Sequence, residues 1–165
     1  MFLLGSALGQ VLLQRAAEQL AQKQGISKLV ETVIGRSILM GVPIFVLLAL
    51  VGPQAFSIFF GSEWMTAGRY VQVLTPLFFL QFVTSPVSVV LIALQKQRVL
   101  ALIQALLLLG AVGSLGVAGH FFRSPLTCLA IYAVLQGIVY ILYLSAIIRY
   151  SSTSIRAVLR EVTFA

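Results

Sequence analysis

The sequence predicts an all-α fold, a polytopic membrane helix bundle that forms a single transmembrane domain over residues 1–165. Hydrophobic residues make up 60% of the chain and charged residues only 9%, and the mean hydropathy is +1.06. A soluble fold of this length could not bury that much apolar surface. The chain also contains uncharged runs long enough to cross a bilayer, which takes about 20 residues of helix. We therefore expect about four full transmembrane helices and a truncated first one.

Residues 1–22 predict the truncated helix and an interfacial extension. The apolar run from Phe2 to Leu13 is only about a dozen residues, which is too short to span a bilayer. Polar residues that follow, such as Arg15 and Glu18, make the continuation amphipathic. This pattern predicts a chain that begins inside a transmembrane helix, so that Met1 is an internal methionine or a wrongly assigned start.

Four mostly apolar runs predict the full spans, at residues 33–60, 65–95, 99–121 and 125–149. The polar stretch before the first run predicts an interfacial helix that leads into it. The second run contains Pro76 and Pro86, and we predict helix kinks there because each proline removes a backbone donor and disturbs the preceding turn. Since lipid cannot satisfy the freed backbone groups, we expect these turns to face neighbouring helices or a wet cavity.

The distribution of basic residues predicts the orientation. Joining the spans alternately places nine Lys and Arg residues on one side and two, Arg69 and Arg123, on the other. By the positive-inside rule the side with nine is cytoplasmic. The tail at residues 150–165, with the C-terminus, is then cytoplasmic, and Glu63 and His120 lie near the outer face. The nine residues are Arg15, Lys23, Lys28, Arg36, Lys96, Arg98, Arg149, Arg156 and Arg160.

Few side chains are suited to catalysis. All four acidic residues fall in predicted loops or interfaces, so no pair of carboxylates lies in mid-membrane for acid-base chemistry or proton coupling. His120 has no second ligand at a suitable spacing, and Cys128 lies in an apolar segment where it is expected to pack as a small hydrophobe. We therefore predict no enzyme activity, no metal and no cofactor. The basic residues are scattered, which argues against nucleic acid and favours anionic lipid headgroups as their partners.

Polar residues inside the spans are candidates for lining a substrate cavity. At 100° per residue, one face of the 65–95 helix and one face of the 125–149 helix each collect four polar side chains. Such faces suit a wet lining that hydrogen-bonds sugar hydroxyls and stacks tyrosine rings on sugars. They also suit hydrogen bonds and aromatic packing between helices, each bond worth about 1 kcal/mol or less, and both interpretations remain open. The residues are Gln81, Thr84, Ser85 and Ser88 on the first face and Tyr132, Gln136, Tyr140 and Tyr143 on the second.

Arg69 is a further candidate. It lies just inside the outer end of its predicted helix, where its long side chain can snorkel to phosphate headgroups. The alternative is that Arg69 holds a substrate phosphate near the outer mouth of a cavity.

Three stretches of the chain carry a family resemblance: GQVLLQRAAEQLA, GVPIFVLLALVGPQAFSIFFGSEW and GRYVQVLTPLFFLQFVTSPVSVVLIALQKQRVL. They resemble the oligosaccharide or polysaccharide flippases of bacterial envelope synthesis, in the superfamily shared with multidrug and toxic-compound exporters. The resemblance covers nearly the whole chain and places it from the eighth of twelve helices to the end. It implies two six-helix halves around a cavity that opens alternately to each side of the bacterial inner membrane. The implied substrate is a polyprenyl-diphosphate-linked oligosaccharide, moved to the outer leaflet for lipopolysaccharide, capsule or exopolysaccharide synthesis.

The chain departs from the family because the first half and the helix before Phe2 are missing, and with them one wall of the cavity. The expected partners are the lipid bilayer, the lipid-linked oligosaccharide and the N-terminal half of the same protein. In the intact protein the two polar faces would line the cavity, and Pro76 and Pro86 would flex as two helical bundles rock. Two alternatives stay open. One is an ion-coupled multidrug exporter, which would more naturally carry a membrane-embedded acid, and the other is a non-transporting assembly or scaffold protein.

Overall fold

The computed structural model describes Gln14, Glu18 and residues 26–121 and 124–153 of the chain. All regular secondary structure in this part is helical, and four helical segments are long and apolar enough to cross a membrane. This confirms the predicted all-α polytopic bundle. The predicted truncated helix and most of the tail lie outside the described residues. In chain order the helices are α2 (Ser27–Phe60), the 3-10 helix η1 (Ser62–Trp64), α3 (Met65–Val87), α4 (Val89–Ala93), α5 (Gln97–Phe121) and α6 (Pro125–Tyr150).

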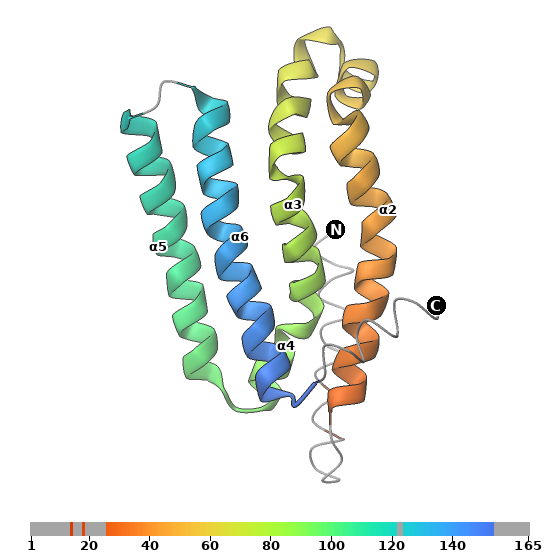
Figure 1. Cartoon of the computed structure of the whole chain (residues 1–165), viewed down its shortest axis with the longest axis vertical. Coiled ribbons are helices and arrows are strands. Elements are labelled where there is room, and N and C mark those ends of the chain that lie inside the picture. The colour runs from red at the N-terminus through yellow and green to blue at the C-terminus, as the bar shows by residue number, and fades with distance from the viewer. Residues whose placement is uncertain (1–13, 15–17, 19–25, 122–123, 154–165) are drawn as a thin grey trace.

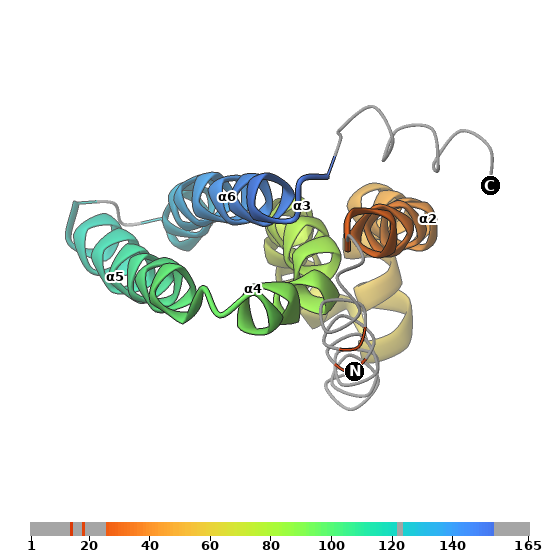
Figure 2. The ribbon, with the colours of Figure 1, turned by 90° about the horizontal axis from the view of Figure 1, so that it is seen from below.

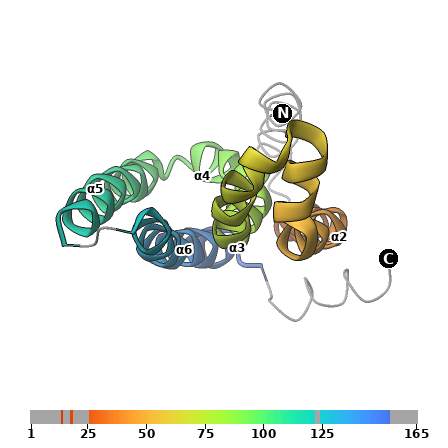
Figure 3. The same ribbon diagram turned by 90° about the horizontal axis from the view of Figure 1, so that it is seen from above.

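The long helices form two antiparallel hairpins, α2–α3 and α5–α6, which lie side by side (Figure 1). Viewed along the helices, α3 lies between α2 and α6, and α5 lies on the far side of α6 (Figures 2 and 3). The hairpins come together where α4 lies and diverge toward the opposite end (Figure 1). We name the two ends of the bundle accordingly. The basic end is where α2 begins and α6 ends, and the η1 end is the opposite one.

The buried core lies at the basic end. Ile34 of α2, Val87 of α3, Leu91 of α4 and Ile147 of α6 are each at most 1% exposed and belong to one contiguous cluster. Close packing of such side chains gives many dispersion contacts, and it leaves no room for a ligand. The two hairpins are therefore joined tightly at this end.

Four described basic residues lie near helix ends at the basic end, whereas Arg69 lies near the start of α3 at the η1 end. Lys28 lies in the first turn of α2, Lys96 and Arg98 flank the start of α5, and Arg149 lies in the last turn of α6. The Lys96 ammonium lies 5.4 Å from the centre of the Tyr150 ring, which is a cation–π distance. The fold thus brings together charges that are far apart in the sequence, as the alternating topology requires.

Helix α2 begins at Ser27, whereas the sequence predicted a separate interfacial helix before a span that starts at residue 33. Val30 and Ile34 are buried one turn apart, and Arg36 is exposed. This amphipathic pattern continues into the apolar run without a turn residue between them. The two predicted segments are consequently one helix of 34 residues.

At the η1 end, α2 and α3 cross at close range. A Cβ atom placed on Gly68 of α3 would lie 2.5 Å from the Cα of Pro53 and 2.8 Å from the carbonyl oxygen of Gly52. These distances are far below van der Waals contact with backbone atoms, so the crossing requires glycine at position 68. Small residues allow such close backbone approach between helices in membranes.

One turn beyond this crossing, the Gln72 side chain of α3 donates a hydrogen bond from Nε2 to the carbonyl oxygen of Ala49 in α2. The Ala49 carbonyl would normally accept from the amide four residues later, but residue 53 is proline and has no N–H. Gln72 therefore satisfies the acceptor that Pro53 leaves vacant. The α2–α3 pair is held by both close packing and a needed hydrogen bond.

The predicted 65–95 span is divided at Ser88 into α3 and α4. Pro86 lacks an amide donor, and the Leu91 amide bonds to the Ser88 carbonyl three residues back at 3.3 Å, which tightens the turn. The break lies two residues after Pro86, beyond the turn that the proline itself disturbs, since the missing donor would have bonded to the Phe82 carbonyl. Helix α3 continues through Pro76 without a break.

Helices α4 and α6 end at the basic end with the same backbone motif. Gln95 and Ser152 have positive φ values, 56° and 54°, in place of the glycine that usually occupies this position. The amide of the next residue in each case bonds back to a carbonyl five residues earlier, as in a Schellman motif. These bonds run from Lys96 to Leu91 (2.8 Å) and from Thr153 to Ile148 (3.0 Å).

Candidate functional site

Polar side chains from three helices meet in a pocket of about 130 Å³ between the two hairpins. We call this pocket the polar groove. It begins beside the core at the basic end and lies toward the middle of the bundle, because its α3 residues occupy the last two turns of that helix. The α3 wall consists of Gln81, Thr84 and Ser85 together with Ser88 at the junction of α3 and α4, the α6 wall of Tyr140 and Tyr143, and the α5 wall of Gln104 and Leu107.

The α3 wall contains the whole polar face predicted for the 65–95 helix, but its members differ in accessibility. Thr84 is fully buried and donates its hydroxyl hydrogen bond to the Leu80 carbonyl at 2.7 Å. Ser88 is half-buried and donates to the Ser85 carbonyl at 2.7 Å. Gln81 and Ser85 are exposed. The hydroxyls of Thr84 and Ser88 thus donate to carbonyls of the same segment, whereas Gln81 and Ser85 present polar atoms at the surface of the bundle.

The α6 wall contains a pair of tyrosines. Their rings are stacked, with centroids 6.5 Å apart and planes 29° apart. Tyr140 is half-buried, whereas Tyr143 is only 3% exposed. The Tyr143 hydroxyl forms no hydrogen bond of standard geometry among the described residues, although the Ser88 side chain lies near enough to interact with it. A buried hydroxyl without a partner costs free energy, and in low-dielectric surroundings this cost is large. The Tyr143 hydroxyl is therefore a hydrogen-bonding group in the wall of the groove that a ligand could satisfy.

Two residues of the predicted α6 face do not line the groove. Gln136 is 3% exposed and turns toward α5, where its Nε2 donates to the Leu107 carbonyl at 2.7 Å. Gly110 of α5 lies opposite, and a Cβ there would lie 3.8 Å from Gln136 Oε1, an atom without a hydrogen-bond partner in the part of the chain that the structure describes. Gln136 joins two helices, in keeping with the packing interpretation of this residue. Tyr132 is half-buried one turn further from the groove.

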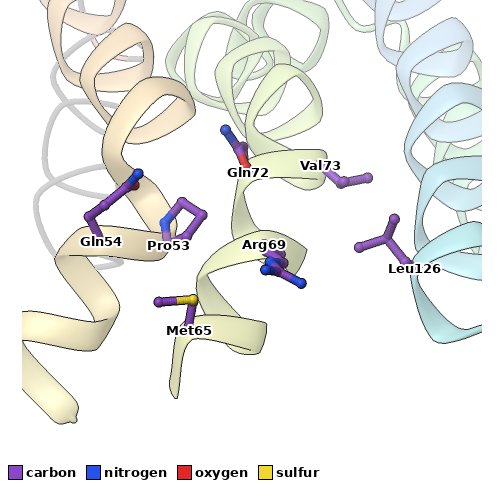
Figure 4. A pocket seen from close by; sticks show the side chains of 7 residues that line it. All are labelled: Pro53, Gln54, Met65, Arg69, Gln72, Val73 and Leu126. Atoms are coloured by element: carbon purple, nitrogen blue, oxygen red, sulfur yellow. The ribbon is translucent and has the colours of Figure 1, made fainter. Parts of the chain in front are cut away.

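Arg69 lies in a separate pocket of about 420 Å³ at the η1 end, which we call the Arg69 pocket. Figure 4 shows Arg69 on α3, between residues of α2 on one side and Leu126 of α6 on the other. Arg69 is exposed, and it shares the pocket with the amides of Gln54 and Gln72. The structure therefore separates Arg69 from the other candidate residues instead of joining them in one site. The remaining lining residues are Pro53, Met65 and Val73.

Sequence reasoning did not select three of the polar residues that line these pockets, Gln54, Gln72 and Gln104. Gln104 could have been selected from the sequence, because it is the one amide side chain in the middle of the apolar run that forms α5. In the structure it lines the groove. Gln72 and Gln54 gave no such signal. Their positions matter only because Pro53 lies beside them at the crossing of α2 and α3.

Among the described residues, no three His, Cys, Asp or Glu side chains are grouped so that they could hold a metal ion. The groove and the Arg69 pocket are instead lined by amides, hydroxyls, aromatic rings and one guanidinium, together with apolar side chains. Comparisons of the chain with models of protein families, with curated proteins and with solved structures found no match.

Proposed function

We propose that the chain is part of a membrane transporter that flips a lipid-linked oligosaccharide across the inner membrane of a bacterium. The observation that supports this proposal is the polar groove, a hydroxyl- and amide-rich pocket set among four apolar membrane-spanning segments. Polar residues within spans are costly and commonly mark a substrate path. The exposed side chains of Gln81 and Ser85 support this proposal most directly, because their polar atoms face away from the helix core and can bind a ligand.

The chemistry of the groove matches an uncharged, hydroxyl-rich headgroup. None of its eight lining residues carries a charge. Sugar hydroxyls both donate and accept, so they can pair with the amide of Gln81 and with the hydroxyls of Ser85 and Tyr143. The half-buried Tyr140 ring offers a flat face to a sugar ring, and aromatic faces bind apolar sugar faces as they bind other planar or apolar groups.

The proposal includes a companion half that completes the cavity. Only 11% of an apolar stretch of 18 residues in α5 is buried, against 33% of such a stretch in the segment Ser62–Ala93. Transporters of this kind bind substrate between two helical bundles, which rock to expose the site to each side alternately. The groove would be one wall of that cavity, with the break at Ser88 as a flexible point beside it. In this arrangement the basic end faces the cytoplasm, together with the C-terminus.

A complementation experiment in the host organism tests the proposal. The chain is deleted and restored as wild type, as Gln81→Trp, or as the control Leu50→Trp, which changes an exposed apolar residue of α2. A tryptophan ring at the exposed position 81 would occupy the groove and exclude the substrate. A loss of about 1.4 kcal/mol of substrate binding corresponds to a factor of ten, so we expect Gln81→Trp to reduce surface glycan by about tenfold. Lipid-linked oligosaccharide should accumulate at the same time.

The control should export glycan at the wild-type level. If both variants restore wild-type surface glycan, the groove is not the path. If deletion itself changes drug susceptibility and leaves surface glycan intact, the chain belongs instead to a drug exporter. If both variants reduce surface glycan equally, the chain contributes to the assembly of a larger complex and not to a substrate path. This result would indicate a scaffold protein.

A further inference from the structure

The Arg69 pocket is polar at its mouth and apolar below. Arg69 lies four residues into α3, about 6 Å from the helix start at a rise of 1.5 Å per residue. Val73 lies one turn deeper on the same helix, and Leu126 faces it from α6 (Figure 4). Exposed aromatic residues, Phe60 and Trp64, mark the same end of the bundle, as aromatic residues do at the membrane interface. The pocket therefore spans the boundary between headgroups and hydrocarbon.

The charge in this pocket is unbalanced. No acidic residue lines it, and Arg69 forms no ion pair or hydrogen bond within the part of the chain that the structure describes. A guanidinium presents a planar set of donors that matches a phosphate group. The Gln54 amide, which is exposed, can donate to the same ligand. A zwitterionic headgroup would bring an ammonium that finds no carboxylate among these lining residues.

We propose that the Arg69 pocket binds one anionic phospholipid of the leaflet at the η1 end, with its phosphate on Arg69 and an acyl chain along Val73 and Leu126. The volume of about 420 Å³ is in the range of sites that hold small ligands. A free phosphate ion would leave the apolar lower part of the pocket unfilled. The amphipathic lining thus favours a lipid over the free ion.

This lipid would act at the place where the two hairpins diverge. Residues of α2, α3 and α6 all line the pocket, whereas the core at the basic end holds the same helices together by direct contact. A bound lipid would fill the space between α3 and α6 at the η1 end. It would then stabilise the separation of the hairpins at that end, independently of which substrate the polar groove takes.

Trp64 provides a probe, because it is the one tryptophan of the chain, it is exposed, and it precedes Met65 of the pocket wall. The full chain is reconstituted in phosphatidylcholine vesicles that contain increasing fractions of phosphatidylglycerol brominated near the top of its acyl chains. Quenching of Trp64 fluorescence then reports the local enrichment of the anionic lipid. The variants are Arg69→Gln, Arg69→Lys and, as a control at the basic end, Arg98→Gln.

We expect wild type to prefer phosphatidylglycerol about fivefold over phosphatidylcholine, in line with the attraction of one basic residue to an anionic surface. Arg69→Gln should abolish this preference, Arg69→Lys should keep part of it, and Arg98→Gln should leave it unchanged. An unchanged preference in Arg69→Gln would overturn the proposal. So would loss of the wild-type preference on addition of millimolar inorganic phosphate, because a free ion would then be the ligand.

Discussion

The two hairpins of the bundle are each closed by a glutamine that donates to a backbone carbonyl of the facing helix, but the two bonds differ in kind. In α2–α3, Gln72 bonds to Ala49, whose carbonyl has lost its helical donor because residue 53 is proline. In α5–α6, Gln136 bonds to Leu107, which still has a helical donor at Ala111. The first bond fills a vacancy, whereas the second is added to an intact helix.

The difference shows how one residue type can serve opposite purposes within a membrane. A carbonyl without a partner is costly in hydrocarbon, so the Gln72 bond removes a penalty that Pro53 created. The Gln136 bond removes no such penalty, and it leaves Gln136 Oε1 buried without a partner among the described residues. We therefore expect the α2–α3 hairpin to depend on its glutamine, and the α5–α6 hairpin to tolerate its loss. Two predictions test this contrast and a third tests the junction between the hairpins, from the largest effect to the smallest.

The largest effect is expected at the α2–α3 crossing. Gly68→Ala places a methyl group 2.5 Å from the Cα of Pro53, so the helices must separate. Overpacking of this kind costs about 1–3 kcal/mol, and the separation also weakens the Gln72 bond. We expect the free energy of unfolding, measured in mixed micelles with a denaturing detergent, to fall by about 3 kcal/mol.

Gly113→Ala in α5 is the matched control, since a Cβ there meets nothing within 4 Å. Replacement of a helical glycine by alanine in open space should be neutral or stabilise by up to about 1 kcal/mol. Equal destabilisation by the two variants would mean that the crossing is not close, and the contrast between the hairpins would be lost.

The second effect concerns the glutamines themselves. Gln72→Leu should lower the free energy of unfolding by about 1–2 kcal/mol, near the upper end for hydrogen bonds in membranes, whereas Gln136→Leu should change it by less than about 0.5 kcal/mol. The role of proline is isolated by a double-mutant cycle. In a Pro53→Ala background, the new alanine would supply the missing amide donor, and Gln72→Leu should then cost about 1 kcal/mol less than in wild type. A cycle with no coupling between positions 53 and 72 would contradict the vacancy explanation.

The smallest effect is expected at the junction that connects the two hairpins. Gln95 has a φ of 56°, a conformation that costs most residues about 1 kcal/mol and costs glycine little. Gln95→Gly should therefore stabilise the chain by about 0.5–1 kcal/mol, measured in the same unfolding experiment. Its control is Gln97→Gly at the start of α5, which should be neutral or destabilising. Destabilisation by Gln95→Gly would show that its side chain has a role in the junction.

The spans could be predicted because charge is costly in a bilayer, so that their limits are visible in the sequence as the ends of apolar runs. The polar face of α3 could also be predicted from the sequence, since helical periodicity alone places Gln81, Thr84, Ser85 and Ser88 on one side. The same reasoning was incomplete for Gln136. Periodicity identifies a face, but whether that face meets a groove or a neighbouring helix depends on how the helices are arranged.

The role of Gln72 illustrates what sequence could not provide. Pro53 predicts a vacant carbonyl at Ala49, but the donor that fills it lies 23 residues away in the chain. Only the crossing of Gly52 and Gly68 brings the two helices close enough for this bond. The break at Ser88 could be predicted only in part. Pro86 indicates the region in which the helix is disturbed, but it does not indicate the residue at which the helix stops.

The most direct test of the proposed transport path is the accessibility of the polar groove to water. With Cys128 replaced by alanine, single cysteines are placed at Ser85 in the groove and at Leu109 on the exposed apolar face of α5. Only a thiol in contact with water ionises and reacts readily, so a charged thiol reagent should label Ser85→Cys at least about tenfold faster than Leu109→Cys. The lipid-linked oligosaccharide should slow labelling of Ser85→Cys alone. Equal, slow labelling at both positions would show a dry groove and contradict its role as a wall of the transport path.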